Sequence, residues 1–274
     1  MTIGGVGCSS LLYVPDNFLY LDPKQIQMNF EEVIFKSEGS SLHGWYFTQT
    51  GFPNPKGMIL FFHGNGQNRS SHFSALRWVL EKGYDYFIFD YRGYADSEGE
   101  ATPEHTVRDG VSALQYLLKR NPKLPLAVLG QSLGGAVAIR SLVEFKTEIG
   151  NFPDHLRLLI LDSTFLSYRR AAASILSKHA LTFLFQPLAL LISDEWSPMR
   201  VKNEMPRIPT LVIHGTHDQI IDEKLGFEVY DAFQGPKFFK QVQGGRHISA
   251  FYENSSQYRD WVGFYMAKYV DQTI

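Results

Sequence analysis

The stretch Gly130-Gln131-Ser132-Leu133-Gly134 decides the fold class, because of the segments on either side of it. Before it, residues 125–129 form a short apolar run that ends at a glycine, as expected of a buried parallel strand. After it, residues 135–139 are small and then apolar, as expected at the start of a packed helix. The sequence therefore predicts a strand, a sharp turn and a helix, with the Ser132 hydroxyl held clear of the sheet at the turn.

A serine hydroxyl is a weak nucleophile at neutral pH, so it needs a base, and the base needs an acid to orient it. After a strand–turn–helix of this kind, the acid and then a histidine are expected later in the chain. Asp218 follows the apolar strand 209–214, and His247 follows the strand 237–242 and a glycine pair. Because strand ends on one side of a parallel sheet converge, we predict that Asp218 orients His247 and that His247 activates Ser132.

Other strand ends offer alternative assignments. Asp162 is the rival acid, and its alternative role is to shape the loop beside the serine turn. Asp90 ends an earlier strand and is expected to be structural, as is Arg92. His63 and His214 also end strands, where packing or hydrogen bonding to loops is the commoner role of a histidine.

The transition state of acyl transfer carries a negative oxygen, so backbone N–H groups must converge on it. One donor should be the amide of Leu133, directly after the serine. The second should come from the loop His63-Gly64-Asn65-Gly66, which follows the apolar strand 57–62. We predict the amide of Asn65 as that donor, and a plain strand-to-helix turn is the alternative reading of the loop.

Strand and helix patterns alternate along the chain and predict an α/β architecture. Eight strands are expected, in a mostly parallel sheet with helices on both faces and an antiparallel pair at its start. The connection between Asp162 and Ile208 is about 40 residues long, which is longer than a usual helical connection. We expect its apolar helical segments to form a cap over the strand ends, with packing on the sheet edge as the alternative.

These motifs resemble those of the α/β-hydrolase superfamily, from about Phe30 to the C-terminus. Within it the chain is similar to serine hydrolases with an HGN-type oxyanion loop, including bacterial lipoprotein-like and depalmitoylase-like hydrolases. The matching motifs are His63-Gly64-Asn65, residues 90–94, the serine turn, His214-Gly215 with Asp218, and Gly245-Arg246-His247. The resemblance implies an N-terminal segment at 1–29 and an α/β-hydrolase domain at 30–274, with a cap insertion at about 165–205.

The resemblance and the predicted triad together imply a serine-dependent carboxylesterase or acyl hydrolase. It would cleave carboxylic esters or thioesters through an acyl-enzyme intermediate, and its expected partner is a small-molecule acyl ester. A peptidase or amidase of the same fold is the alternative, because the same triad cleaves amides. This chemistry requires no metal or organic cofactor.

Composition limits the number of domains and the classes of partner and metal site that the chain could have. A chain of 274 residues, 44% of them hydrophobic, is suited to one large domain. The net charge is −2 with no basic cluster, which argues against nucleic acid as a partner. Cys8 is the only cysteine, which excludes an internal disulfide and a cysteine-based zinc site.

The N-terminus offers a second resemblance, to the end of a bacterial lipoprotein signal. Val6-Gly7-Cys8-Ser9-Ser10 has the pattern in which a cysteine is lipidated after cleavage. The preceding residues lack the basic region and the long apolar region of a complete signal peptide. We expect the parent protein to attach to a membrane through lipidated Cys8, in the bacterial cell envelope rather than the cytoplasm.

Overall fold

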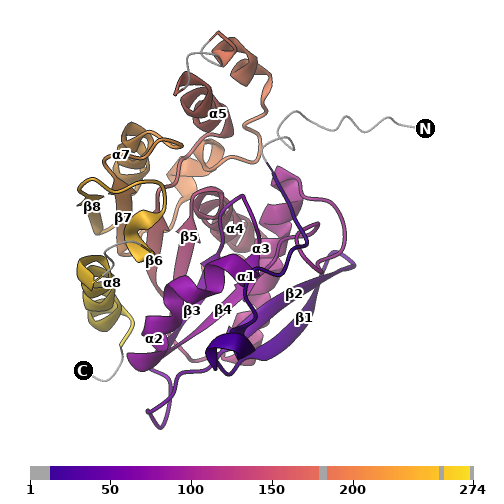
Figure 1. Cartoon of the computed structure of the whole chain (residues 1–274), viewed down its shortest axis with the longest axis vertical. Helices are drawn as coiled ribbons and strands as arrows, with labels where there is room; N and C mark the ends of the chain where they lie inside the picture. Colours follow the sequence, from indigo (N-terminus) through magenta and orange to yellow (C-terminus); the bar gives the residue numbers. More distant parts are fainter. Residues whose placement is uncertain (1–12, 179–183, 253–255, 272–274) are drawn as a thin grey trace.

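An eight-stranded sheet forms the centre of the computed structural model, which describes residues 13–178, 184–252 and 256–271 (Figure 1). The strand order is β1-β2-β4-β3-β5-β6-β7-β8, with β2 antiparallel to β1 and β4 and all other pairs parallel. The strands are β1 (Glu31–Ser37), β2 (Ser40–Phe47), β3 (Gly57–Phe62), β4 (Tyr84–Phe89), β5 (Leu126–Gln131), β6 (Leu156–Asp162), β7 (Thr210–Gly215) and β8 (Lys237–Val242). The prediction of a mostly parallel eight-stranded sheet with an antiparallel start is confirmed.

Helices cover both faces of this sheet. The first face carries α3 (Pro103–Arg120), α4 (Leu133–Ile149) and α7 (Glu223–Ala232). The second face carries α1 (Arg69–His72), η3 (Phe73–Leu76), α2 (Arg77–Glu81), η6 (Ser249–Phe251) and α8 (Ser256–Tyr269). α1, η3 and α2 follow one another as three short pieces, and Leu76, at φ −105° and ψ 6°, departs from α-helical geometry where η3 meets α2.

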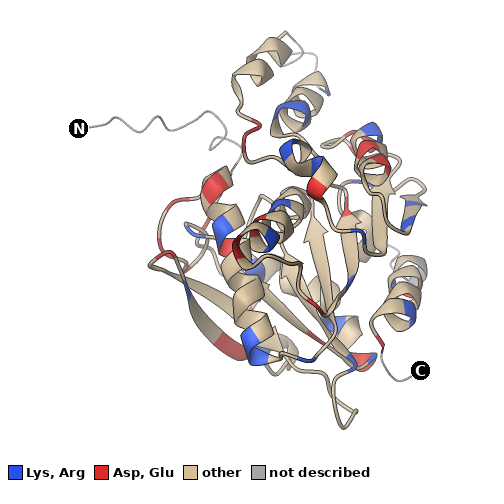
Figure 2. Cartoon of the chain, turned by 180° about the vertical axis from the view of Figure 1, so that it is seen from behind, with Lys and Arg blue, Asp and Glu red and all other residues tan. Residues whose placement is uncertain are grey.

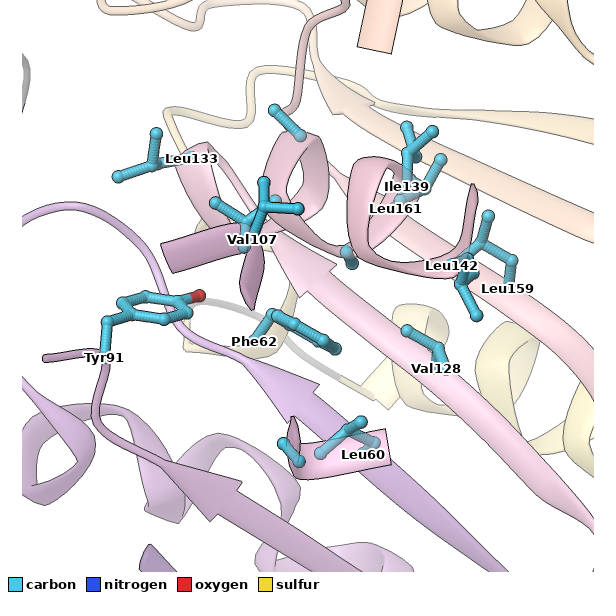
Figure 3. Packing of buried hydrophobic residues seen from close by; sticks show 14 of the residues in the cluster. Leu60, Phe62, Tyr91, Val107, Val128, Leu133, Ile139, Leu142, Leu159 and Leu161 are labelled. Atoms are coloured by element: carbon cyan, nitrogen blue, oxygen red, sulfur yellow. The ribbon is translucent and has the colours of Figure 1, made fainter. Parts of the chain in front are cut away.

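The strands at the centre are buried on both faces. Every residue of β3, β4 and β5 is buried, as a parallel sheet covered by two helical layers requires. Figure 3 shows Leu60, Phe62 and Val128 of these strands in one cluster with Ile139 and Leu142 of α4. Full burial of each such side chain contributes roughly 1.5–3 kcal/mol to folding. The strand that leads to Ser132 is therefore held firmly from both sides.

Most charged residues lie outside this core. Lys, Arg, Asp and Glu are interspersed on the helices and loops, and the central strands carry few of them (Figure 2). In the part of the chain that the structure describes, no helix has both the length and the apolar composition needed to cross a bilayer. The predicted lipidation site, Cys8, lies outside the described residues.

The connection between β6 and β7, residues 163–209, is the segment expected to form a cap. It contains α5 (Tyr168–Ser177), η4 (Gln186–Leu191) and η5 (Pro198–Glu204). Figure 1 shows α5 above the end of the sheet where β5, β6 and β7 finish. Ser167 caps α5, because its Oγ accepts a hydrogen bond from the amide of Arg170 at 3.1 Å and donates one to Asp194 at 2.6 Å.

The segment at residues 13–29, which includes η2 (Pro23–Ile26), packs along the domain. Tyr13 is buried, and its hydroxyl lies 2.9 Å from that of Thr106 and 3.1 Å from that of Tyr168. Val14 forms an isolated parallel bridge with Gly66. The segment therefore crosses the loop that follows β3.

Candidate active site

Ser132 occupies the turn between β5 and α4 in a strained conformation. Its φ of 53° and ψ of −121° lie outside the common regions for L-residues, at a cost of about 1–3 kcal/mol. The flanking glycines permit the turn, since a Cβ on Gly130 would lie 2.5 Å from the Gly135 Cα and one on Gly134 would lie 2.2 Å from the Phe62 carbonyl oxygen. This geometry places the serine at the C-terminal end of the sheet.

A chain of hydrogen bonds joins Ser132, His247 and Asp218. Ser132 Oγ lies 2.9 Å from His247 Nε2, and His247 Nδ1 lies 2.7 Å from Asp218 Oδ2. An ionised carboxylate only accepts, so Nδ1 carries a proton and Nε2 of the neutral ring is free to accept the serine proton. The structure thus brings together the three side chains that the strand order and chain order predicted.

The Asp218 carboxylate is buried and has a hydrogen-bond donor for each oxygen. Oδ1 accepts from the amides of Ile220 and Ile221 at 2.8 and 2.9 Å. Oδ2 lies 2.7 Å from His247 Nδ1 and 3.3 Å from His214 Nε2. Burial disfavours the charged form, but the hydrogen bonds from His214 and His247 outweigh it and hold the pKa of Asp218 well below its usual range. The carboxylate is therefore ionised at neutral pH.

His214, for which the sequence predicts packing or hydrogen bonding to a loop, contacts the acid of this site. It ends β7, four positions before Asp218, and its side chain is fully buried. Burial alone would lower the pKa of His214, but hydrogen bonds to the Asp218 carboxylate and the Ile221 carbonyl raise it overall. The sequence signals for this contact are the His214-Gly215 motif and the short spacing between this strand-end histidine and Asp218.

Asp162, the rival acid, lies at the end of β6 and hydrogen-bonds to residues other than His247. Its carboxylate accepts from Gln131 Nε2 at 3.1 Å and from Ser163 Oγ at 3.0 Å. Ser163 Oγ also accepts a hydrogen bond from the amide of Ile248, directly after His247, at 3.1 Å. Burial raises the pKa of Asp162. Its contacts therefore support the serine turn and the loop that carries His247.

The loop after β3 is held by Val14 and Tyr94, whose contacts with Asn65 were not predicted from the sequence. Asn65 Oδ1 accepts a hydrogen bond from the amide of Val14 at 2.9 Å. The Tyr94 hydroxyl lies 2.9 Å from the backbone oxygen of Asn65 and 3.0 Å from its Oδ1. Asn65 and Leu133, the two predicted oxyanion-hole residues, both line the cavity beside Ser132.

Asp90 and Arg92 bind other parts of the framework. Asp90 accepts from the amide of Arg69 at 2.7 Å and from its guanidinium, and lies 3.3 Å from His63 Nε2. The amide and Nε of Arg92 donate to the buried Asp109 at 2.8 and 2.9 Å. These contacts tie the loops after β3 and β4 to each other and to α3.

A cavity of about 500 Å³ opens beside Ser132. The insertion contributes Phe165, Ala171 and Ile175, and other parts of the chain contribute Gly64, Asn65, Gly66, Gln67, His72, Leu133, Ile220, Ile221, His247 and Ile248. Burial and the nearby His63 lower the pKa of His72 to about 4, so this histidine is neutral at neutral pH. None of the described lining residues is acidic. The cavity therefore presents mostly apolar, uncharged surface next to the serine.

The same part of the molecule offers no arrangement for a metal ion. Within residues 13–178, 184–252 and 256–271, no three His, Cys, Asp or Glu side chains are grouped so that they could bind one.

The family model described as serine aminopeptidase, S33, matches residues 53–203, more than half of the chain. The chain belongs to this family of α/β-hydrolases. This hydrolase is 31% identical over 277 residues to the uncharacterized protein YfhR of Salmonella typhimurium, which covers 96% of this chain and 87% of YfhR. It is 30% identical to the lysophosphatidylserine lipase ABHD12 of Danio rerio over 68% of this chain and 49% of that protein.

Solved structures share the fold of this hydrolase. An esterase of Pyrococcus furiosus superposes with a TM-score of 0.75 at 18% identity, over 94% of this chain and 98% of the esterase. The acylaminoacyl peptidase of Pyrococcus horikoshii superposes with a TM-score of 0.68 at 16% identity, over 92% of this chain and 43% of the peptidase. The predicted membership of the α/β-hydrolase superfamily is confirmed.

Proposed function

We propose that this hydrolase cleaves carboxylic esters or thioesters through an acyl-enzyme intermediate on Ser132. The observation that supports it is the hydrogen-bonded chain from Ser132 Oγ through His247 to Asp218, with contacts of 2.9 and 2.7 Å. In the first step His247 Nε2 takes the serine proton while Oγ attacks the carbonyl carbon. Asp218 keeps the imidazole oriented and stabilises its charged form, because its own low pKa keeps it ionised.

The remaining steps use the same groups. The amides of Leu133 and Asn65 donate to the negative oxygen of the tetrahedral intermediate. His247 returns its proton to the leaving group, and the acyl group stays on Ser132 as an ester. His247 then removes a proton from water, which attacks the acyl carbon. As the bond from the acyl carbon to Ser132 Oγ breaks, His247 gives that proton to Oγ, which releases the acid and regenerates the free serine.

The apolar lining of the cavity supports an acyl chain as the group held beside Ser132. Burial of one methylene is worth about 0.8 kcal/mol, which corresponds to roughly fourfold in kcat/KM for each added carbon until the cavity is full. The relative named as a lysophosphatidylserine lipase carries a substrate name of this chemical kind.

The alternative is cleavage of amides, and the family description as serine aminopeptidase favours it. An aminopeptidase must bind a charged substrate amino group, and a carboxylate is the natural partner for it. The described lining of the cavity contains no Asp or Glu, so the observed surface favours the ester.

A parallel screen tests both proposals. The wild type, Ser132→Ala and the exposed-serine control Ser177→Ala are assayed on 4-nitrophenyl esters from acetyl to palmitoyl and on aminoacyl arylamides. We expect ester turnover in the wild type and the control, and a loss of roughly a million-fold in Ser132→Ala. Faster turnover of arylamides than of esters would support the peptidase, and ester turnover that survives in Ser132→Ala would contradict the mechanism.

A further inference from the structure

His214 presents a second imidazole to the acid of the triad. Its Nε2 lies 3.1 Å from the carbonyl oxygen of Ile221 and 3.3 Å from Asp218 Oδ2. Both of these oxygens only accept, so Nε2 must carry a proton. One N–H group of His214 is therefore shared between a backbone carbonyl and the carboxylate oxygen that also receives the N–H of His247.

The surroundings hold the His214 ring in this orientation. The side chain is fully buried at the end of β7. Its Nδ1 has no hydrogen-bond partner among the described residues and lies against α7, where a Cβ on Gly226 would be 2.3 Å from it. The ring is thus fixed by packing on one side and by two oxygen acceptors on the other.

We propose that His214 is a positioning residue of the triad, which holds the Asp218 carboxylate for His247 and sets the pH range in which His247 is an available base. This proposal rests on the proposed function of Ser132, His247 and Asp218. An N–H donor on Oδ2 offsets part of the negative charge that faces His247. Removal of that donor leaves more negative charge on Oδ2, which favours the imidazolium that forms when His247 takes a proton.

Other charged and titratable groups also surround Asp218 and His247. These groups are unchanged in a variant that replaces His214 alone. Asp162 is buried at the end of the neighbouring strand β6, and His217 is exposed on the same loop as Asp218. Lys178 Nζ donates to the backbone oxygen of Asp218 at 3.3 Å and lies 3.7 Å from Asp222. Arg246 and Tyr252 line a cavity with His247. A shift in a His214 variant therefore reports on the His214 contact.

The test is the pH dependence of kcat/KM on a soluble 4-nitrophenyl ester. The enzymes compared are the wild type, His214→Phe, His214→Gln and the control His217→Ala. A fluorophosphonate titration of Ser132 counts the competent sites in each sample. We expect His214→Phe to lower kcat about tenfold per competent site, as for the loss of one hydrogen bond to a charged group. The fall of kcat/KM at low pH should begin at a higher pH in His214→Phe than in the wild type. His214→Gln retains an N–H donor, so both its kcat and its pH profile should lie between those of His214→Phe and the wild type.

Each result decides the proposal. Unchanged kcat per competent site and an unmoved acid limb in His214→Phe would overturn it, because a purely structural role changes only the number of competent sites. Where the variants do not fold, ¹⁵N-histidine NMR of the wild type decides instead. A His214 ring with its proton on Nε2 supports the proposal, and one with its proton only on Nδ1 overturns it. Failure of the proposed function can be distinguished from failure of the His214 proposal. If the proposed function is wrong, Ser132→Ala retains turnover, independently of the result for the His214 variants.

Discussion

The backbone amide of Val14 donates a hydrogen bond of 2.9 Å to the side-chain oxygen of Asn65, which joins the N-terminal segment to the loop proposed to bind the oxyanion. The Tyr94 hydroxyl lies 3.0 Å from the same side-chain oxygen and 2.9 Å from the backbone oxygen of Asn65. We therefore expect the side chain of Asn65 to help fix the position of its backbone amide.

The first prediction follows from this contact. Asn65→Ala keeps the backbone amide and the backbone oxygen that Tyr94 contacts, but removes the side-chain oxygen that accepts from Val14 and lies 3.0 Å from the Tyr94 hydroxyl. Loss of an oxyanion donor costs about 10²–10³ in kcat, so its misplacement should cost less, about tenfold, with KM little changed. Steady-state kinetics on a short ester measure this, and Tyr94→Phe should show a smaller effect of the same kind. Wild-type kcat in Asn65→Ala would contradict the role of the side chain.

The second prediction distinguishes the two buried acids. Asp218→Asn should lower kcat on the order of ten thousand-fold, because an amide at this position favours the wrong tautomer of His247. Asp162 hydrogen-bonds to Gln131 and Ser163, so Asp162→Asn should cost far less in kcat. Turnover on one ester at saturating concentration gives both values. The assignment is wrong if Asp162→Asn is the more damaging of the two.

The third prediction concerns the cavity. Ala171 on α5 lines it, and a phenylalanine there would fill part of its volume of about 500 Å³. In the wild type, kcat/KM should rise roughly fourfold for each added acyl carbon. Ala171→Phe should end that rise at a shorter chain, and Ser177→Phe, at an exposed position of the same helix, should leave it unchanged. The same chain-length profile in both variants would place the acyl chain elsewhere.

The fourth prediction is a dependence of stability on pH. The pKa of His72 is about 4 in the folded state, lowered by burial and by the nearby His63, against 6.5 for an unperturbed histidine. Protonation therefore favours the unfolded chain, so this contribution to stability is fully present above about pH 6.5 and is lost as the pH falls toward 4. The loss is on the order of 2 kcal/mol between about pH 7.5 and pH 4.5.

Urea unfolding of the wild type and His72→Gln at these two pH values measures this contribution. Acidification should destabilise the variant less than the wild type by that amount, because the other titrating groups are common to both. An equal loss in the two proteins would show that His72 is not a buried neutral histidine.

The strands and the order of the site residues could be predicted because each depends on local sequence. Apolar runs ending at glycines located β5 and β7. Strand ends and chain order then favoured Asp218 as the acid and His247 as the base, with Asp162 left as the rival acid. The contacts of His214 with Asp218 and of Val14 with Asn65 were not predicted, because they form only when the loops are folded. No periodicity in the sequence encodes which strand-end histidine faces the acid.

The edge position of β8 has a consequence for how this protein loses activity on heating. β8 pairs only with β7 and most of its residues are half-buried, whereas β3, β4 and β5 are buried throughout. Local opening at such an edge needs less free energy than global unfolding. Because His247 follows β8, this opening removes the base while the turn at Ser132 stays intact. On heating, turnover should therefore be lost at a lower temperature than the native circular dichroism signal. Activity would then report the loss of the native structure earlier than secondary structure does.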